Sequence, residues 1–176
     1  MARMDTSPRF LAAGMACLML AACGTTPPPP VPAAPVVTPQ QRLDAVRAAA
    51  GVDDTELDVQ PLRDPQVEDL RVRAHEALAG GQAEAAADAL NQALLIVPDD
   101  PAVLQERAEI ALLQAQYERA ETLARRAYDV GSRVGPLCRR HWATIEQARL
   151  ARDQAENAAS ARGQLATCTV PGLQRF

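Results

Sequence analysis

Residues 67 to 100 read VEDLRVRAHEALAGGQAEAAADALNQALLIVPDD, and residues 101 to 134 read PAVLQERAEIALLQAQYERAETLARRAYDVGSRV. Placed over one another at an offset of 34 residues, the two stretches share nine identical positions. Four of the identities are alanine pairs, and the other five are Leu70/Leu104, Arg73/Arg107, Leu78/Leu112, Gln82/Gln116 and Glu84/Glu118. Self-similarity at a fixed period indicates a fold made of stacked units.

The period and the residues at fixed places within it resemble the tetratricopeptide repeat family, whose unit is a helix, a turn and a second helix. The matching residues are Gly81 at the turn, Ala86 and Ala93 where the helices approach, Leu90 at the bulky core position and Pro98 at the end. The second unit departs from the pattern with Ala115 at the turn and Ser132 in place of the proline. The resemblance implies an all-α, TPR-like α-solenoid, and a plain αα bundle is the alternative.

A third unit follows at a larger offset because of four extra residues in a linker at 131–136. Trp142 and Ile145 fall at the bulky positions, Asp153 and Gln154 at the turn, and Ala158 at the small position. Three hairpins then cover residues 67 to 168, and three is the usual minimum for a stable stack. Arg73 and Arg107 replace the usual leucine. The stem of Arg73 is expected to flank the core while its guanidinium reaches water.

The composition favours helices and an acidic surface. The chain has 36 alanines, no lysine and only five aromatic residues, which disfavours an all-β domain. The net charge of −4 gives no footprint for nucleic acid, so no nucleic-acid partner is expected. A glycine-rich phosphate loop and a nucleophile motif are both missing from the sequence. We therefore expect no enzyme activity, no metal, no cofactor and no small-molecule substrate.

The N-terminus has the layout of an export signal. Residues 1 to 22 carry two arginines and then an apolar run from Phe10 to Ala22, which is too short for a membrane span. The run ends in Leu20-Ala21-Ala22-Cys23, which resembles the lipobox of bacterial lipoproteins. The resemblance implies a lipid on Cys23, and Gly24 after it implies the periplasmic face of the outer membrane. A secreted protein cut by the general signal peptidase is the alternative.

The segment that follows is a predicted spacer. Residues 23 to 41 contain seven prolines between Pro27 and Pro39, which favour an extended polyproline conformation over a folded element. A ligand for an SH3-like domain is the alternative use of these prolines. Residues 42 to 66 are expected to hold a short helix, closed by Gly51, and an acidic loop, and residues 169 to 176 form a tail.

Two of the four cysteines fall within the predicted repeats. Cys138 begins the first helix of the third hairpin and Cys168 ends its second helix, so the two lie at neighbouring ends of an antiparallel pair. We predict a disulfide between them, since an exported protein folds where disulfides persist. Free thiols are one alternative. A metal or redox site built from Cys138, His141, Cys168 and His75 is another.

A stack of helical hairpins offers a groove lined by the first helix of each unit. The resemblance to the family assigns the groove positions to Arg71, His75, Gln105, Glu109, Arg140, Thr144 and Gln147. The expected function is that of an envelope lipoprotein that binds a protein partner. Tetratricopeptide lipoproteins of similar architecture assist assembly of pili, secretins or the outer membrane, or activate peptidoglycan synthases. The alternative is a thiol- or metal-dependent periplasmic protein.

Overall fold

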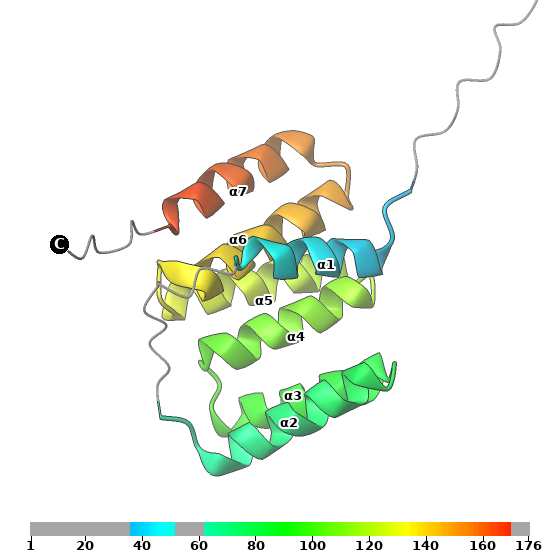
Figure 1. Ribbon diagram of the computed structural model, residues 1–176, viewed down its shortest axis with the longest axis vertical. Coiled ribbons are helices and arrows are strands. Elements are labelled where there is room, and N and C mark those ends of the chain that lie inside the picture. Colours follow the sequence, from blue (N-terminus) through cyan, green and yellow to red (C-terminus); the bar gives the residue numbers. More distant parts are fainter. Residues whose placement is uncertain (1–35, 52–61, 170–176) are drawn as a thin grey trace, which may run out of the picture. The chain divides into compact units, whose positions relative to one another are not determined.

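The computed structural model describes residues 36–51 and 62–169, and these residues are all-helical with no strand. The helices are α1 (Pro39–Ala49), α2 (Pro65–Ala79), α3 (Ala83–Ile96), α4 (Pro101–Leu113), α5 (Tyr117–Val130), α6 (Gly135–Leu150) and α7 (Ala155–Thr167) (Figure 1). None of these helices is both long and apolar enough to span a membrane. The expected signal, Cys23, the spacer as far as residue 35, the acidic loop at 52–61 and residues 170–176 lie outside the described residues.

Several helices begin at a proline that follows a capping side chain. Asp64 accepts a hydrogen bond from the backbone N–H of Gln66, and Asp100 accepts bonds from two N–H groups of α4 at 2.9 and 3.1 Å. Proline suits the first helical position because its missing N–H would have no partner there. The same rule corrects one predicted boundary. Thr38 caps α1 and Pro39 starts it, so the helix begins inside the stretch expected to be a spacer.

The turns within the three hairpins occupy equivalent positions in the repeat. Gly81, Ala115 and Asp153 each have a positive φ, of 74°, 58° and 57°. Their spacing reproduces the 34-residue period and the four extra residues of the third unit. Glycine adopts this conformation without strain, whereas alanine does so at a cost of about 1 kcal/mol. The second unit therefore keeps the turn geometry despite lacking the glycine.

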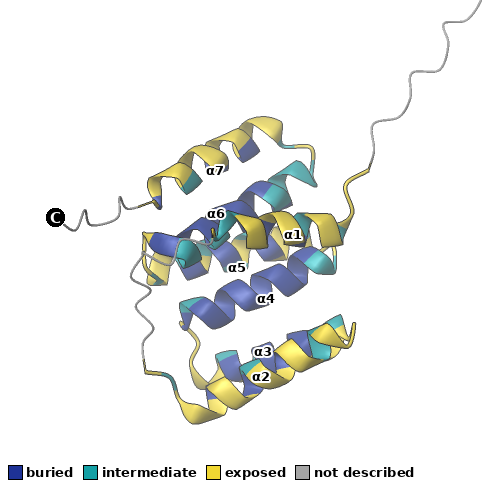
Figure 2. Ribbon diagram, viewed as in Figure 1, coloured by how far each residue is buried: buried dark blue, intermediate teal, exposed yellow. Residues whose placement is uncertain are grey.

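The helices pair into three hairpins, α2–α3, α4–α5 and α6–α7, and successive hairpins stack through α3 on α4 and α5 on α6. The described part of the chain is a TPR-like helical stack. Alanines fill the interfaces between helices, and Ala86, Ala93, Ala120 and Ala158 are all buried. The middle hairpin has neighbours on both sides. As a result, every residue of α4 from 102 to 112 is buried (Figure 2).

Two equivalent arginines show how position in the stack changes a side chain's surroundings. Arg73 on α2 is exposed, as expected. Arg107, its counterpart on α4, is almost fully buried, and its Nε donates to Asn91 at 2.9 Å. Burial lowers the pKa of Arg107, and the nearby charge of Arg119 lowers it further. The internal unit thus encloses a residue that the terminal unit leaves in water.

The predicted short helix α1 contacts two helices from different hairpins, α4 and α6. It buries Leu43 and Val46. Val46 belongs to a cluster of small and apolar residues that includes Ala111, Leu112, Ala143 and Ala148. α1 therefore covers the face of α4 and α6 on which the sequence places a binding groove (Figure 1).

Candidate protein-interaction groove

The first helices α2, α4 and α6 carry the seven residues assigned to the groove, and the structure divides these residues into two groups. Arg71, His75 and Arg140 retain access to solvent. Gln105, Glu109 and Thr144 are buried, and Gln147 is half-buried under α1. The groove expected along all three helices is thus partly filled.

Gln105 is the centre of a buried polar network that joins α4 to α6. Its Nε2 donates to Glu109 Oε1 and to Thr144 Oγ1, both at 2.8 Å. Its Oε1 lies 2.7 Å from His141 Nδ1, so the imidazole N–H donates to it. Gln105 and Thr144, which the family pattern assigns to the groove, are both fully enclosed by neighbouring helices in this structure.

Glu109 also lies inside this interface rather than on an open surface. Its carboxylate accepts hydrogen bonds from Gln105 and from Arg140 Nε, the latter at 2.8 Å. Buried charges persist in proteins when they are paired and hydrogen-bonded in this way. Glu109 therefore holds Arg140 at the edge of the interface. The family pattern assigns Glu109 to the groove surface, whereas the structure buries it as the ion-pair partner of Arg140.

Gln147 contacts α1 in place of an external ligand. Arg42 Nη1 on α1 lies 3.4 Å from both the Oε1 and the backbone oxygen of Gln147. At the other end of α1, Arg139 Nε donates to the Ala50 carbonyl oxygen at 2.9 Å. The groove position of Gln147 is therefore occupied by this chain's own helix.

The other half of the layer, between α2 and α4, is held by exposed and half-buried ion pairs. Arg71 Nε donates to Glu106 Oε2 at 3.0 Å and its Nη1 donates to Glu68 at 2.7 Å. The hydrogen bond to Glu106 raises the pKa of Arg71 above its usual value, against the effect of burial. His75 Nε2 lies 3.4 Å from Glu106 Oε1 with its side chain largely exposed. These residues form the rim of an open surface.

A cavity of about 380 Å³ opens between α1 and α2 over α4. Its lining combines apolar side chains, such as Leu78 and Ile110, with Arg47, His75 and Arg140. A second cavity of about 440 Å³ shares Arg47 and Leu78 with it. The two cavities adjoin at these two residues, and together we call them the open groove. Glu106 and Glu109 in its lining are paired with arginines, and in the described residues Arg47 is exposed and has no ion-pair partner.

The sequence did not identify Arg47, Leu78 and Ile110 as groove residues. Leu78 was available as a repeated position, shared with Leu112. Arg47 could not be found by the repeat pattern, because it enters the site only through the docking of α1.

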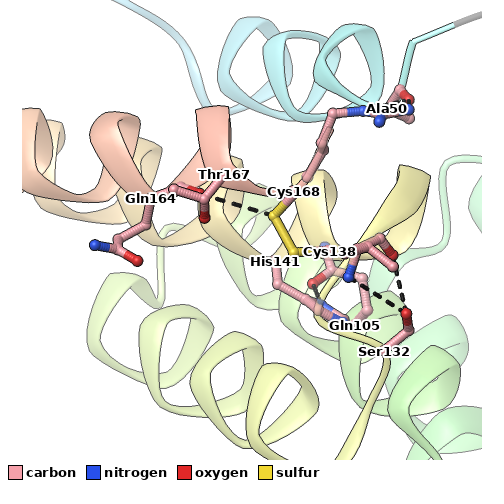
Figure 3. Close-up of a disulfide and its surroundings, with 10 residues drawn as sticks. Ala50, Gln105, Ser132, Cys138, His141, Gln164, Thr167 and Cys168 are labelled. Carbon is pink, nitrogen blue, oxygen red and sulfur yellow. Dashed lines mark hydrogen bonds between the residues drawn. A yellow bond between two sulfur atoms is a disulfide. The ribbon is translucent and has the colours of Figure 1, made fainter. Parts of the chain in front are cut away.

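The residues of the predicted thiol or metal site do not form one. Cys138 and Cys168 are joined by a disulfide with a Cα–Cα distance of 5.7 Å (Figure 3). No three His, Cys, Asp or Glu side chains within residues 36–51 and 62–169 are grouped to hold a metal ion. His75 is on α2 beside Glu106, whereas His141 forms a hydrogen bond with Gln105. The described residues give the thiol or metal alternative no support.

His141 is instead an uncharged part of the interface between α4 and α6. Burial, and secondarily the charge of Arg140, lowers its pKa to about 3. Its Nε2 is buried with no hydrogen-bond partner. A neutral imidazole that donates only through Nδ1 suits a structural role in the Gln105 network.

Comparison with known proteins finds similarity to a solved structure. No protein-family model matches the chain, and no curated protein matches it. Among solved structures, the globular C-terminal domain of P. aeruginosa LpoP is 30% identical, with a TM-score of 0.56. The similarity covers 60% of this chain and 99% of that domain.

Proposed function

Because the helical domain belongs to the family of the LpoP globular C-terminal domain, we propose that this chain is an envelope lipoprotein whose domain binds and regulates another protein. The observation that carries the proposal is the open groove, whose lining combines apolar side chains with the exposed, unpaired Arg47. Ligand sites are typically concave and apolar with a few polar groups that fix orientation. The domain then acts by contact, without catalysis, cofactor or metal.

Among the envelope processes that the sequence resemblance offers, we favour regulation of a peptidoglycan synthase, since the similarity to the LpoP domain supports this class of lipoprotein. The rest of the chain would position the domain. A lipid on Cys23 would hold the protein at the periplasmic face of the outer membrane, because two or more acyl chains give stable attachment. The proline-rich residues that follow would keep the domain clear of the lipid.

The groove is tested by photocrosslinking in intact cells. A photoreactive residue at Leu78, inside the open groove, should capture a peptidoglycan synthase. The same residue at Leu95, which is 83% exposed on α3 and outside the groove, should not. The substitution Arg47→Glu should abolish capture from position 78, and Arg73→Glu on the exposed face of α2 serves as the matched control. Equal capture from both positions, or capture insensitive to Arg47→Glu, would argue against this groove as the working surface.

The anchor is tested separately. Cys23→Ser should move the protein from the membrane fraction to the soluble periplasmic fraction. If the Cys23→Ser chain remains with the outer membrane, lipid on this cysteine is not what holds it there.

A further inference from the structure

The linker between α5 and α6 is an insertion in the repeat, and the structure holds it in place at both ends. It has four residues more than the 34-residue period requires. Gly131 lies so close to α4 that a Cβ there would come within 2.9 Å of Pro101 Cβ. At the other end, the Gly135 N–H donates to the Cys168 carbonyl oxygen at 2.8 Å. Insertions in repeat proteins often form loops on the binding face, and an ordered loop binds at a lower entropic cost.

Four side chains beside the linker form a row of aromatic and cationic contacts. The rings of Tyr128 on α5 and Trp142 on α6 meet edge to face, with their centroids 4.9 Å apart. The guanidinium carbon of Arg125 lies 5.3 Å from the centroid of the Trp142 ring. That of Arg133 lies 4.7 Å from the centroid of the Tyr128 ring. A cation over an aromatic face is attracted to it, so both guanidinium groups are held in place on this surface.

The part of the chain that the structure describes neutralises neither of these arginines. Arg125 is half-buried and Arg133 is exposed. Among the described residues, neither forms an ion pair or donates a hydrogen bond. Asp129 is the one carboxylate between them in the sequence, and it is exposed and forms no ion pair with either. The surface therefore presents two guanidinium groups against one carboxylate.

Two exposed valines lie next to the arginines in the chain. Val130, the last residue of α5, is 45% exposed, and Val134, next to Arg133, is 47% exposed. The Ser132 Oγ accepts a hydrogen bond from the Val134 N–H at 3.3 Å and donates to its carbonyl oxygen at 3.0 Å, which fixes the backbone there. We call this region the α5–α6 surface, and it consists of Arg125, Tyr128, Val130, Arg133 and Val134.

We propose that the α5–α6 surface binds an acidic segment of a protein partner, in which carboxylates lie next to an apolar side chain. Guanidinium groups bind carboxylates through paired N–H donors. Arginine and aromatic residues are also frequent anchors of protein interfaces. The chain has a net charge of −4, so its overall field opposes a polyanion such as nucleic acid or an anionic membrane. A short acidic segment needs only the local charge of the two arginines.

This surface is separate from the open groove, whose lining contains no residue of α5 or of the linker at 131–136. The proposal therefore goes beyond the proposed function and does not depend on it. Photocrosslinking from Leu78 tests the open groove alone, so either surface can fail without the other.

The chemistry is tested by NMR titration of the mature chain, residues 23 to 176, prepared without lipid. The probe is the peptide acetyl-Leu-Asp-Asp-Leu-amide, and the matched control is acetyl-Leu-Asn-Asn-Leu-amide. The acidic peptide should shift the amide signals of residues 125 to 134 and the side-chain Nε–H signals of Arg125 and Arg133. The neutral peptide should shift them much less. A purely structural role for the two arginines predicts no difference between the peptides, and equal shifts would overturn the proposal.

Matched variants of the chain show whether the arginines carry this binding. The chain with both Arg125→Gln and Arg133→Gln should bind the acidic peptide about fivefold or more weakly than wild type, because it loses two charged donors. Arg73→Gln removes an exposed arginine of α2 and should bind as wild type does. Circular dichroism shows that each variant remains folded. Unchanged binding in the double variant, or shifts confined to the open groove, would overturn the proposal.

The partner segment is tested in intact cells with a photoreactive residue at Val134. Mass spectrometry of the crosslinked peptide should find Asp or Glu within a few residues of the crosslinked position. Capture should be lost with Arg133→Glu and kept with Arg73→Glu. A captured segment without acidic residues, capture insensitive to Arg133→Glu, or no capture would overturn the proposal.

Discussion

The two halves of the layer formed by α2, α4 and α6 are built in different ways. Between α4 and α6, Gln105 and Thr144 are fully buried in a hydrogen-bonded network, and α1 covers the outer face. Between α2 and α4, Arg71 and Glu106 pair at the rim of an open groove. The same repeat pattern thus produces a closed half filled by buried polar contacts and an open half that contains a solvent-accessible cavity.

The largest expected effect is on the third hairpin, which carries α6 of the closed half and in which the disulfide ties the start of α6 to the end of α7. Replacing both Cys138 and Cys168 with serine should lower the free energy of unfolding by about 3 to 4 kcal/mol, because a cross-link closing a loop of 30 residues restricts the unfolded chain. Urea unfolding with and without reductant measures this loss. Thiol titration of the denatured, unreduced domain should find no free thiol at these positions. One free thiol per cysteine would contradict the pairing.

The next effect concerns the Gln105 network. Gln105→Leu should destabilise the domain by about 2 to 3 kcal/mol, because the substitution leaves His141 Nδ1–H and Thr144 buried without this partner. Gln114→Leu is the matched control, since Gln114 makes an exposed bond to Glu84. Its expected cost is below about 0.5 kcal/mol. Similar costs for both variants would show that the buried hydrogen bonds of Gln105 contribute no more to stability than the exposed hydrogen bond of Gln114.

A smaller effect appears as a pH dependence of the closed half. The pKa of His141 is lowered to about 3 in the folded protein, against an unfolded value of 6.5. Above pH 6.5, His141 is neutral in both the folded and the unfolded chain, so it does not reduce the free energy of unfolding. As the pH falls from 6.5 toward 3, the free energy of unfolding declines, because the unfolded chain binds a proton at His141 before the folded chain does. From pH 7 to pH 5 the loss due to this group is about 2 kcal/mol. Urea unfolding at both pH values should show a smaller pH dependence for His141→Gln than for wild type, and an unchanged dependence would contradict the assignment.

The smallest effect is expected in the open half. Arg71→Ala should cost about 1 to 2 kcal/mol, because the side chain of Glu106 is only 10% exposed and loses its guanidinium partner while His75 stays 3.4 Å away. Arg73→Ala, at an exposed position with no ion-pair partner among the described residues, should be close to neutral. A loss above about 2 kcal/mol for Arg71→Ala in urea unfolding would show that the two halves are less different than the structure indicates.

The sequence was sufficient to predict the helices and their turns, because the residues that determine them lie close together in the chain and recur with each repeat. The 34-residue offset located the turns at Gly81 and Ala115, and the linker at 131–136 accounted for the shift to Asp153. The LpoP similarity confirms the all-α, TPR-like fold.

The groove was predicted less well because accessibility depends on tertiary contacts. The family pattern assigns Gln105, Glu109 and Thr144 to a surface, and it contains no information about a helix outside the repeats. α1 was predicted as a helix, but its docking depends on Leu43 and Val46 meeting small residues of α4 and α6. The repeat places an arginine at the same position in the first two units, but it could not predict that Arg107 is buried whereas Arg73 is exposed.

The position of α1 in the chain also has a mechanical consequence. It is the first helix of the described domain, and its N-cap Thr38 directly follows the proline-rich residues. A pulling force applied through the N-terminal side therefore reaches α1 before it reaches the hairpins. Since α1 rests on two buried side chains while the third hairpin is cross-linked by Cys138 and Cys168, the force would peel α1 away and leave the stack intact.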